Sequence, residues 1–284
     1  MDGYRIKAYA KINLGLDVVR RLPNGYHEVR MVMQNVGLWD ELTLERAEGG
    51  ITITTDADSL PTGEDNLIHK AARLMLDKYG CPGLRVHLRK TIPIAAGMAG
   101  GSTDAAAAMK GISHLYGLGL SPAQLMEDGV AIGADVPYCI LGGTALAEGI
   151  GEKLTPLPPL PFCHILIAKP AVSVSTKYVY QHLDACGIEM HPDIDGMVQA
   201  VRDGSLRGVL ERMGNVLETV TVPAHPVIAD IKARMQELGA ADSLMSGSGP
   251  TVFGIFLDRG KAEAALERFR QEELAGQAFL TTPV

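Results

Sequence analysis

The sequence contains few aromatic residues and few cysteines. Phe, Trp and Tyr make up 5% of the 284 residues, so few side chains can stack on a planar ligand. The cysteines are scattered and form no CxxC pair, which excludes a disulfide framework and a cysteine zinc site; they are Cys81, Cys139, Cys163 and Cys186. The eight histidines include no HExxH or other metal spacing, and we expect no structural metal.

The sequence also lacks an excess of basic charge and a long apolar run. A formal net charge of -7 argues against a nucleic-acid-binding surface, which needs clustered Lys and Arg. No segment approaches the ~18 apolar residues of a membrane span, and the N-terminal segment MDGYRIKAYAK has no signal-peptide core. We therefore expect a soluble, cytoplasmic protein without nucleic-acid or membrane partners; its oligomeric state stays open.

With 46% hydrophobic residues the chain can bury a core of one large or two ordinary domains. Four prolines lie within residues 153–162, KLTPLPPLPF, and hold that segment extended. This predicts two domains, residues 1–154 and 155–284. Both halves mix alternating segments with amphipathic ones, which indicates an α+β fold.

The expected strands are those with alternating or short apolar patterns: residues 5–18, 41–45, 51–55, 83–90, 164–170 and 250–258. The expected helices have helical periodicity and end signals: residues 65–80, 121–133, 227–239 and 261–274. In the second helix, Ser121 is the expected N-cap, Pro122 the first helical residue and Gly133 the residue just past the end.

A glycine-rich turn precedes an alanine-rich helix in TIPIAAGMAGGSTDAAAAM, residues 91–109. Pro93 leads into the turn Gly97–Gly101, and Ser102, Thr103 and Asp104 open the helix. Free N–H groups and the helix dipole suit a phosphate, but a plain turn with a helix cap explains the pattern about equally well. The segment lacks the lysine of a P-loop, so positive charge must come from elsewhere, and Asp104 could itself occupy the positive pole.

Three further segments are ambiguous when taken singly. LMSGSGPTVFG, residues 244–254, could form an anion nest, although a tight turn is more common. Alternation places Lys11 and Asn13 on the polar face of their strand, where most residues face water. Asp135 lies in a connection that Pro137 constrains, with Val136 expected to be extended; turn aspartates are common and rarely catalytic.

Two segments carry tyrosines beside turns. NGYHEV presents Tyr26 and His27 after an Asn-Gly turn, and SVSTKYVY presents Thr176 and Tyr180. Such tyrosines could stack on a planar ligand, but a tyrosine packed on the core is the more common case.

Together these segments resemble the GHMP kinases, the family of galactokinase, homoserine kinase and mevalonate kinase. The resemblance rests on AKINLGLDV, NGYHEV, EDNLIHKAARL, PIAAGMAGGSTDAA, IGADVPYCI and SGSGPTVFG, in that order. It implies an N-terminal domain like domain 2 of ribosomal protein S5 and a C-terminal ferredoxin-like domain. GADVP and GYH resemble those members that phosphorylate a hydroxyl of a cytidine diphosphate compound, with ATP and Mg²⁺.

The resemblance also implies roles for single residues. Lys11 and Asp135 match the catalytic pair: Asp135 accepts the hydroxyl proton, and Lys11 keeps it ionised and offsets phosphoryl charge. The segment Gly97–Thr103 matches the phosphate loop. The residues implied to bind ATP are Pro93, Gly97, Met98, Ala99, Gly100, Gly101, Ser102, Thr103 and, near the adenine, Asn66. Those implied to bind the cytidine substrate are Asn13, Tyr26, His27, Thr176 and Tyr180.

The sequence departs from the family pattern at Met98 and Ala99, where Leu-Gly is common, and at Thr103, which replaces a frequent serine. These changes leave a backbone cradle intact. No acidic Mg²⁺ ligand can be identified, so ATP oxygens, water and Ser102 are the expected ligands. The rival hypotheses are a GHMP kinase acting on homoserine or a mevalonate derivative, a non-catalytic ATP-binding sensor, and a structural or nucleic-acid module.

Overall fold

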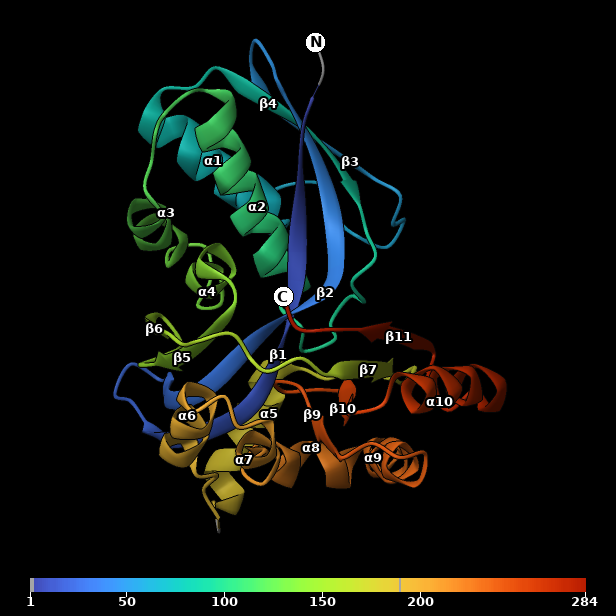
Figure 1. Ribbon diagram of the computed structural model, residues 1–284. Coiled ribbons are helices and arrows are strands. Elements are labelled where there is room, and N and C mark those ends of the chain that lie inside the picture. The colour runs from blue at the N-terminus through green and yellow to red at the C-terminus, as the bar shows by residue number, and fades with distance from the viewer. Residues whose placement is uncertain (1–2, 189) are drawn as a thin grey trace. The chain divides into compact units, whose positions relative to one another are not determined.

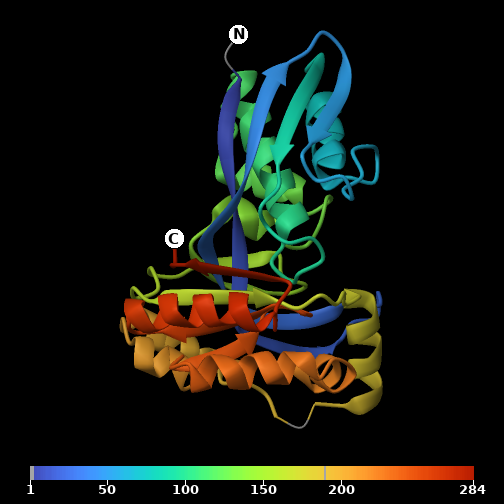
Figure 2. The ribbon, with the colours of Figure 1, turned by 90° about the vertical axis from the view of Figure 1, so that its right-hand side faces the viewer.

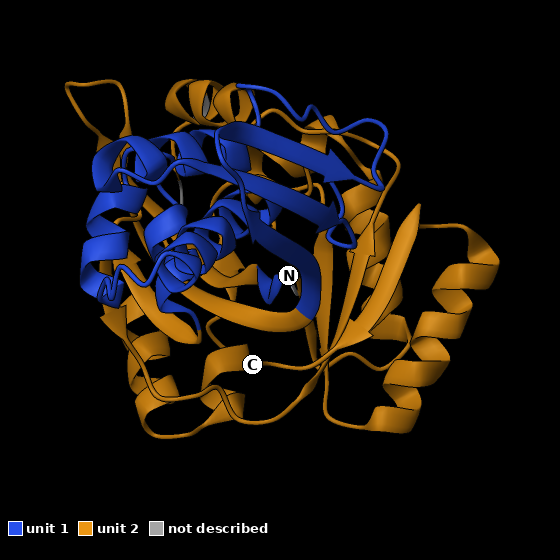
Figure 3. Cartoon of the chain, turned by 90° about the horizontal axis from the view of Figure 1, so that it is seen from above, with its two compact units in different colours: residues 1–10, 38–94, 99–142 blue, residues 11–37, 95–98, 143–284 orange. Residues whose placement is uncertain are grey.

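The structure, a computed structural model, describes residues 3–188 and 190–284. The chain forms two compact units, coloured separately in Figure 3. Unit 1 consists of Met1–Ala10, Leu38–Ile94 and Ala99–Gly142, and unit 2 of Lys11–Gly37, Ala95–Met98 and Gly143–Val284. Two long strands, β1 (Tyr4–Arg21) and β2 (His27–Arg46), therefore contribute residues to both units. Within the described residues, no helix is long and apolar enough to cross a membrane.

Unit 1 combines strands with helices that pack on them (Figure 1). Strand β4 pairs antiparallel with β2, with Glu41 opposite Arg89, and parallel with β3. Helix α2 lies so close to β2 that a Cβ on Gly111 would come within 2.7 Å of the Leu44 side chain. The elements of this unit are β3 (Gly50–Thr55), α1 (Leu67–Tyr79), β4 (Gly83–Arg89), α2 (Gly100–Leu115), α3 (Pro122–Gly129) and α4 (Val136–Leu141).

The ends of α3 show where local signals succeed and fail. At its start, Ser121 accepts a hydrogen bond from Gln124 N, and the Gln124 side chain accepts one from Ser121 N, so the predicted N-cap is confirmed as a capping box. The predicted end at Gly133 is wrong, because α3 ends at Gly129. A Cβ on Gly129 would lie 2.9 Å from Val136, so close packing against α4 requires this glycine.

In unit 2, short strands pair with the long strands β1 and β2. Strand β5 pairs antiparallel with β2 and with β6, and β8 runs parallel to β1, with Gly15 opposite Gly214. Strand β6 is the first part of the proline-rich segment from which the domain boundary at residues 154 and 155 was predicted; that boundary stays a proposal. The bounds are β5 (Thr144–Glu148), β6 (Lys153–Pro156) and β8 (Gly214–Asn215).

The C-terminal part of unit 2 is built on a four-stranded sheet in the order β11-β7-β10-β9. Strand β10 lies antiparallel between β7 and β9, and β11 pairs antiparallel with β7. This is the split βαβ arrangement of the predicted ferredoxin-like fold. Helices α9 and α10 pack on the sheet (Figure 2). The bounds are β7 (His164–Lys169), α9 (Val227–Glu237), β9 (Asp242–Met245), β10 (Val252–Phe256), α10 (Arg259–Glu272) and β11 (Gln277–Thr281).

Between β7 and α9, the residues that the structure describes form four helices and the short strand β8. One of them, α6, packs on the polar face of β1 at Gly15, where an added Cβ would lie 2.9 Å from Ile194. The expectation that Lys11 and Asn13, on the same face, lie in water is wrong, because they are 4% and 0% exposed. The bounds are α5 (Thr176–Cys186), α6 (Ile194–Arg202), α7 (Leu206–Leu210) and α8 (Glu218–Ala224).

Candidate active site

Lys11 is held on β1 by groups on both sides of its side chain. Its Nζ donates to Asn13 Oδ1 at 2.6 Å and to the carbonyl oxygen of Gly97 at 3.1 Å. Its backbone N–H donates to Met98 O at 3.2 Å. Since β1 alternates, Asn13 follows on the same face as Lys11. Unit 2 thus brings together three of the residues predicted from the sequence, Lys11, Asn13 and Gly97, and fixes the direction of the ammonium group.

The first glycine segment needs glycine at Gly97. Its φ is +71°, and an added Cβ would lie 2.3 Å from Ser246 O. The same carbonyl of Gly97 that accepts from Lys11 also accepts from Ser246 Oγ at 3.1 Å. The backbone at Gly97 therefore lies close to both Lys11 and the second glycine loop, which is the segment of residues 244–254. Such close approach is expected for a loop that binds a ligand with main-chain groups. Pro93, before it, is buried.

Helix α2 begins at Gly100 with an open N-terminus. Its N-cap is Ala99, at φ +57°, and no side chain caps it. The alternative that Ser102, Thr103 or Asp104 serves as the cap is therefore wrong; instead Thr103 Oγ1 donates to Tyr9 O at 2.8 Å. The first N–H groups of an uncapped helix carry partial positive charge and suit an anion.

Asp104 does not occupy the positive pole, because it is 2% exposed and lies in a buried cluster. Lys90 Nζ donates to Asp104 Oδ2 at 2.7 Å and to Asp40 Oδ2 at 2.5 Å. Asp40 Oδ1 accepts from the backbone of Thr91 and Ile92, whereas Asp104 Oδ1 has no partner among the described residues. This cluster anchors the first turn of α2 to β2 and to the segment after β4.

Two of these groups have shifted pKa values. Burial, reinforced by the Asp40 carboxylate and opposed by Lys90, raises the pKa of Asp104 to about 8. Burial works to lower the pKa of Lys90, but Asp104 and Asp40 together outweigh burial and raise it. No sequence pattern predicts this cluster, because Asp104 and Asp40 lie 14 and 50 residues from Lys90 and only the packing of α2 brings them together.

The second glycine loop, between β9 and β10, is held by a residue that sequence reasoning missed. Asn215 is buried, and its Nδ2 donates to Met245 O and Gly247 O, each at 2.8 Å. Ser248 Oγ, in this loop, is hydrogen-bonded to Thr176 Oγ1 at 2.8 Å. Thr176, which was predicted to bind the substrate, therefore lies beside the loop. A Cβ on Gly247 would be 3.4 Å from Lys11 Nζ. The two glycine segments thus meet at Lys11.

Asp135 lies immediately before α4, in unit 1. Its backbone is helical, with φ -82° and ψ -14°, and its carboxylate makes no capping bond to the helix. The expectation that Val136 is extended is wrong, because Val136 and Pro137 form the first turn of α4. Proline is tolerated there since the first N–H groups of a helix need no partner within it. Asp135 is half-buried, and its carboxylate is not used as a helix cap.

The predicted aromatic residues are only partly together. Tyr26 is 59% exposed in the turn between β1 and β2, where its N–H donates to Asn24 Oδ1. His27 and Tyr180 are in ring contact, with centroids 4.8 Å apart. Asp184, which sequence reasoning missed, lies 2.7 Å from His27 Nε2. The sandwich of one base between Tyr26 and Tyr180 stays a proposal.

Asn66 is the N-cap of α1. Its Oδ1 accepts from Ile68 N at 2.7 Å, and its Nδ2 donates to Pro61 O at 2.7 Å. Both the oxygen and the nitrogen of this side-chain amide are thus hydrogen-bonded within unit 1. The proposal that Asn66 lies near the adenine of ATP stays a proposal.

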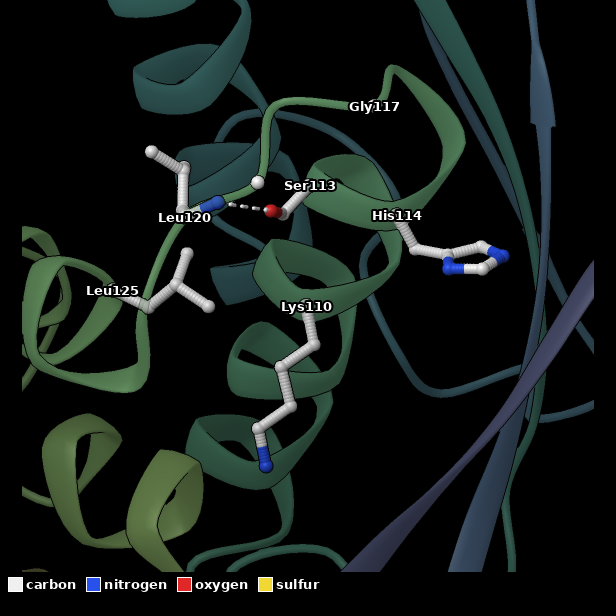
Figure 4. Close-up of a pocket in the computed structure, with 7 residues that line it drawn as sticks. Lys110, Ser113, His114, Gly117, Leu120 and Leu125 are labelled. Carbon is white, nitrogen blue, oxygen red and sulfur yellow. Dashed lines mark hydrogen bonds between the residues drawn. The ribbon is translucent and has the colours of Figure 1, made fainter.

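Unit 1 also has an open hollow of about 450 Å³ at the end of α2 (Figure 4). Burial lowers the pKa of Lys110 there, and its ammonium donates to Cys139 O at 3.2 Å. The His114 ring stacks on Tyr4. No residue predicted for the site lines this hollow, whose walls are Lys110, Ser113, His114, Gly117, Gly119, Leu120 and Leu125.

Two family models match the chain. The model of the GHMP kinases N-terminal domain matches residues 66–143, and that of the GHMP kinases C-terminal domain matches residues 197–275. A protein of Lachnospira eligens with the name 4-diphosphocytidyl-2-C-methyl-D-erythritol kinase is 56% identical over 99% of this chain and 98% of its own. The chain belongs to the GHMP kinase family. The predicted resemblance is confirmed, and membership in a kinase family implies the use of ATP.

Solved structures agree with this fold. A crystal structure of 4-(cytidine 5'-diphospho)-2C-methyl-D-erythritol kinase matches this GHMP kinase with a TM-score of 0.83 and 33% identity, covering 99% of each chain. A homoserine kinase from Cytophaga hutchinsonii matches with a TM-score of 0.79 at 20% identity, covering 100% of this chain and 95% of its own. The second likeness shows the shared fold alone. The mixed α/β fold with GHMP N- and C-terminal domains is thus confirmed.

Proposed function

We propose that this GHMP kinase transfers the γ-phosphoryl group of ATP to the 2-hydroxyl of 4-diphosphocytidyl-2-C-methyl-D-erythritol, giving the 2-phosphate and ADP. This reaction belongs to the methylerythritol phosphate pathway to isoprenoid precursors, and we place it in the cytoplasm. The observation that carries the proposal is the similarity to the Lachnospira eligens relative of that name, 56% identical over 99% of the chain.

The glycine segments support ATP binding without a P-loop lysine. The segment around Gly97 brings backbone close to Lys11, and α2 starts without a side-chain cap. Main-chain N–H groups and the helix dipole are the donors that phosphate oxygens need. In this proposal Ser102 and Thr103 lie at the phosphates with the backbone of Gly100 and Gly101, and Lys11 supplies positive charge.

The phosphoryl transfer is proposed to be direct, without a phospho-enzyme. Asp135 accepts the proton of the attacking hydroxyl, and its carboxylate is suited to this because it is not used as a helix cap. Lys11 keeps Asp135 ionised and offsets the charge of the transferred group. Positioning and charge neutralisation supply most of the rate acceleration.

Mg²⁺ is proposed to bind together with ATP. The described residues hold no group of three or more His, Cys, Asp or Glu side chains that could form a metal cage. This fits an ion that keeps several waters and takes most ligands from phosphate oxygens, with Ser102 as the proposed protein ligand. When bound, the ion neutralises phosphate charge.

The deciding experiment measures ADP release by the purified protein with the cytidylyl substrate, and with homoserine and mevalonate as alternatives. We expect ADP release with the cytidylyl compound alone. Asp135→Ala should lower kcat by ~10² to 10⁴ while ATP affinity changes little, the range for losing a general base. Asp203→Ala, at an exposed position after α6, is the matched control and should behave as the wild type. Near-wild-type turnover of Asp135→Ala would remove Asp135 from the mechanism.

A further inference from the structure

A carboxylate and an aromatic ring hold the His27 imidazole at the start of β2. His27 Nε2 lies 2.7 Å from Asp184 Oδ1, and the Tyr180 ring packs against the imidazole at 33°. Tyr180 and Asp184 are four residues apart on α5, so they lie on the same face of that helix. The His27 side chain is 9% exposed. Its ring therefore has one orientation, fixed by two residues of one helix.

The Asp184 contact also determines which ring nitrogen carries the proton. An ionised carboxylate only accepts hydrogen bonds, so Nε2 must be the protonated nitrogen that donates to it. In the neutral imidazole the other nitrogen, Nδ1, is then an acceptor. Nδ1 has no hydrogen-bond partner among the residues that the structure describes. The exposed Arg21 guanidinium also lies near this carboxylate, 3.5 Å from Asp184 Oδ2.

An acceptor at the edge of an aromatic surface distinguishes two pyrimidines. Cytosine presents an amino group, a donor, where uracil presents a carbonyl oxygen, an acceptor. A neutral His27 whose Nδ1 carries no proton can accept a hydrogen bond from the cytosine amino group. The same Nδ1 cannot donate a hydrogen bond to the uracil carbonyl oxygen. With the opposite tautomer, the preference would be reversed.

We propose that Asp184 is a positioning residue that fixes the His27 tautomer and thereby makes the enzyme select a cytidylyl over a uridylyl substrate. This inference rests on the proposed function. Asp184 acts through His27 and does not itself contact the base. A purely structural tie between α5 and β2 would stabilise the fold without affecting the choice of base.

The test compares kcat/KM for the cytidylyl substrate and its uridylyl analogue. In Asp184→Ala we expect KM for the cytidylyl compound to rise about tenfold with kcat little changed, and the preference for cytidylyl over uridylyl to fall about tenfold. Asp184→Glu, which restores the acceptor, should recover part of the preference. Gln181→Ala, on the exposed side of α5, is the control and should leave both values unchanged.

Nitrogen-15 NMR of labelled histidine tests the tautomer without the reaction. The His27 signals, assigned with His27→Gln, should show a protonated Nε2 and an unprotonated Nδ1 at mildly alkaline pH, and Asp184→Ala should mix the two tautomers. A wild-type ring protonated on Nδ1 would overturn the proposal, as would an Asp184→Ala enzyme with an unchanged base preference. ADP release with neither compound would overturn the proposed function and with it the specificity role, while the nitrogen shifts still report the tautomer.

Discussion

The buried cluster of Lys90, Asp40 and Asp104 should make the stability of the protein fall as pH rises through neutrality. One lysine faces two carboxylates, all within unit 1. Asp40 Oδ1 accepts hydrogen bonds from two backbone N–H groups. Asp104 Oδ1 is buried and has no hydrogen-bond partner in the described part of the chain, and the pKa of Asp104 is raised to about 8. Below that pH Asp104 therefore carries a proton.

The size and sign of the effect follow from proton linkage. In the unfolded chain the pKa of Asp104 returns to about 3.8, against about 8 in the folded chain. Between these values the folded chain binds one more proton, so its stability falls with rising pH by about 1.4 kcal/mol per pH unit. The contribution is fully present below about pH 4 and is lost above about pH 8. From pH 6 to pH 8 this amounts to roughly 2 kcal/mol.

Asp104→Asn tests this effect, because Asn keeps the shape and can still accept from Lys90 but cannot ionise. Urea unfolding at pH 6, 7 and 8 can be followed by the fluorescence of Trp39, the single tryptophan, which adjoins Asp40 in β2. Between pH 6 and 8 the wild type should lose roughly 2 kcal/mol more unfolding free energy than the variant.

The control for this experiment is Asp40→Asn, which removes one of the two carboxylates at Lys90 and should be destabilised at every pH. Equal pH slopes for the wild type and Asp104→Asn would refute the reasoning, because they would mean that Asp104 is ionised throughout this range.

Three other changes test the site. Tyr26→Ala should raise KM for the cytidylyl substrate by about 5- to 100-fold through loss of base stacking; an unchanged KM counts against that role. Gly97→Ala should raise KM for ATP at least about tenfold, since its Cβ would lie 2.3 Å from Ser246 O. Gly143→Ala is its control: Gly143 has φ +70°, but an added Cβ would have no described atom within 4 Å. An equal rise in KM for ATP in both variants would refute the argument. Asn215→Ala should lower the unfolding free energy by about 2 to 4 kcal/mol in urea titrations, and a change under about 1 kcal/mol would contradict the anchoring role.

Local signals predicted about half of the described helices and strands. The alternation in β1 extends over the observed strand, and the N-cap at Ser121 has the predicted geometry. Alternation could not show that the polar face of β1 is covered, because α6 comes from a segment more than 170 residues later. The end of α3 at Gly129 was missed for the same reason, since close packing against Val136 requires that glycine.

The candidate site was predicted where its residues lie in recognisable segments. Lys11, Gly97 and His27 were identified from their motifs, and the structure places each beside a partner. Asn215 and Asp184 were missed, because a single Asn in a short strand or Asp in an ordinary helix has no pattern of its own. Their partners, the second glycine loop and His27, are distant in the sequence.

The sequence by itself determined the family, about half of the described helices and strands, and the glycine segments, since periodicity, capping and backbone freedom depend on near neighbours along the chain. Only the tertiary structure decided the electrostatics. It buried Lys11, left α2 without a side-chain cap, paired Asp104 with Lys90 and placed Asp184 on His27. Burial and charge contacts between distant segments set the protonation of such groups, and these contacts exist only after the chain has folded.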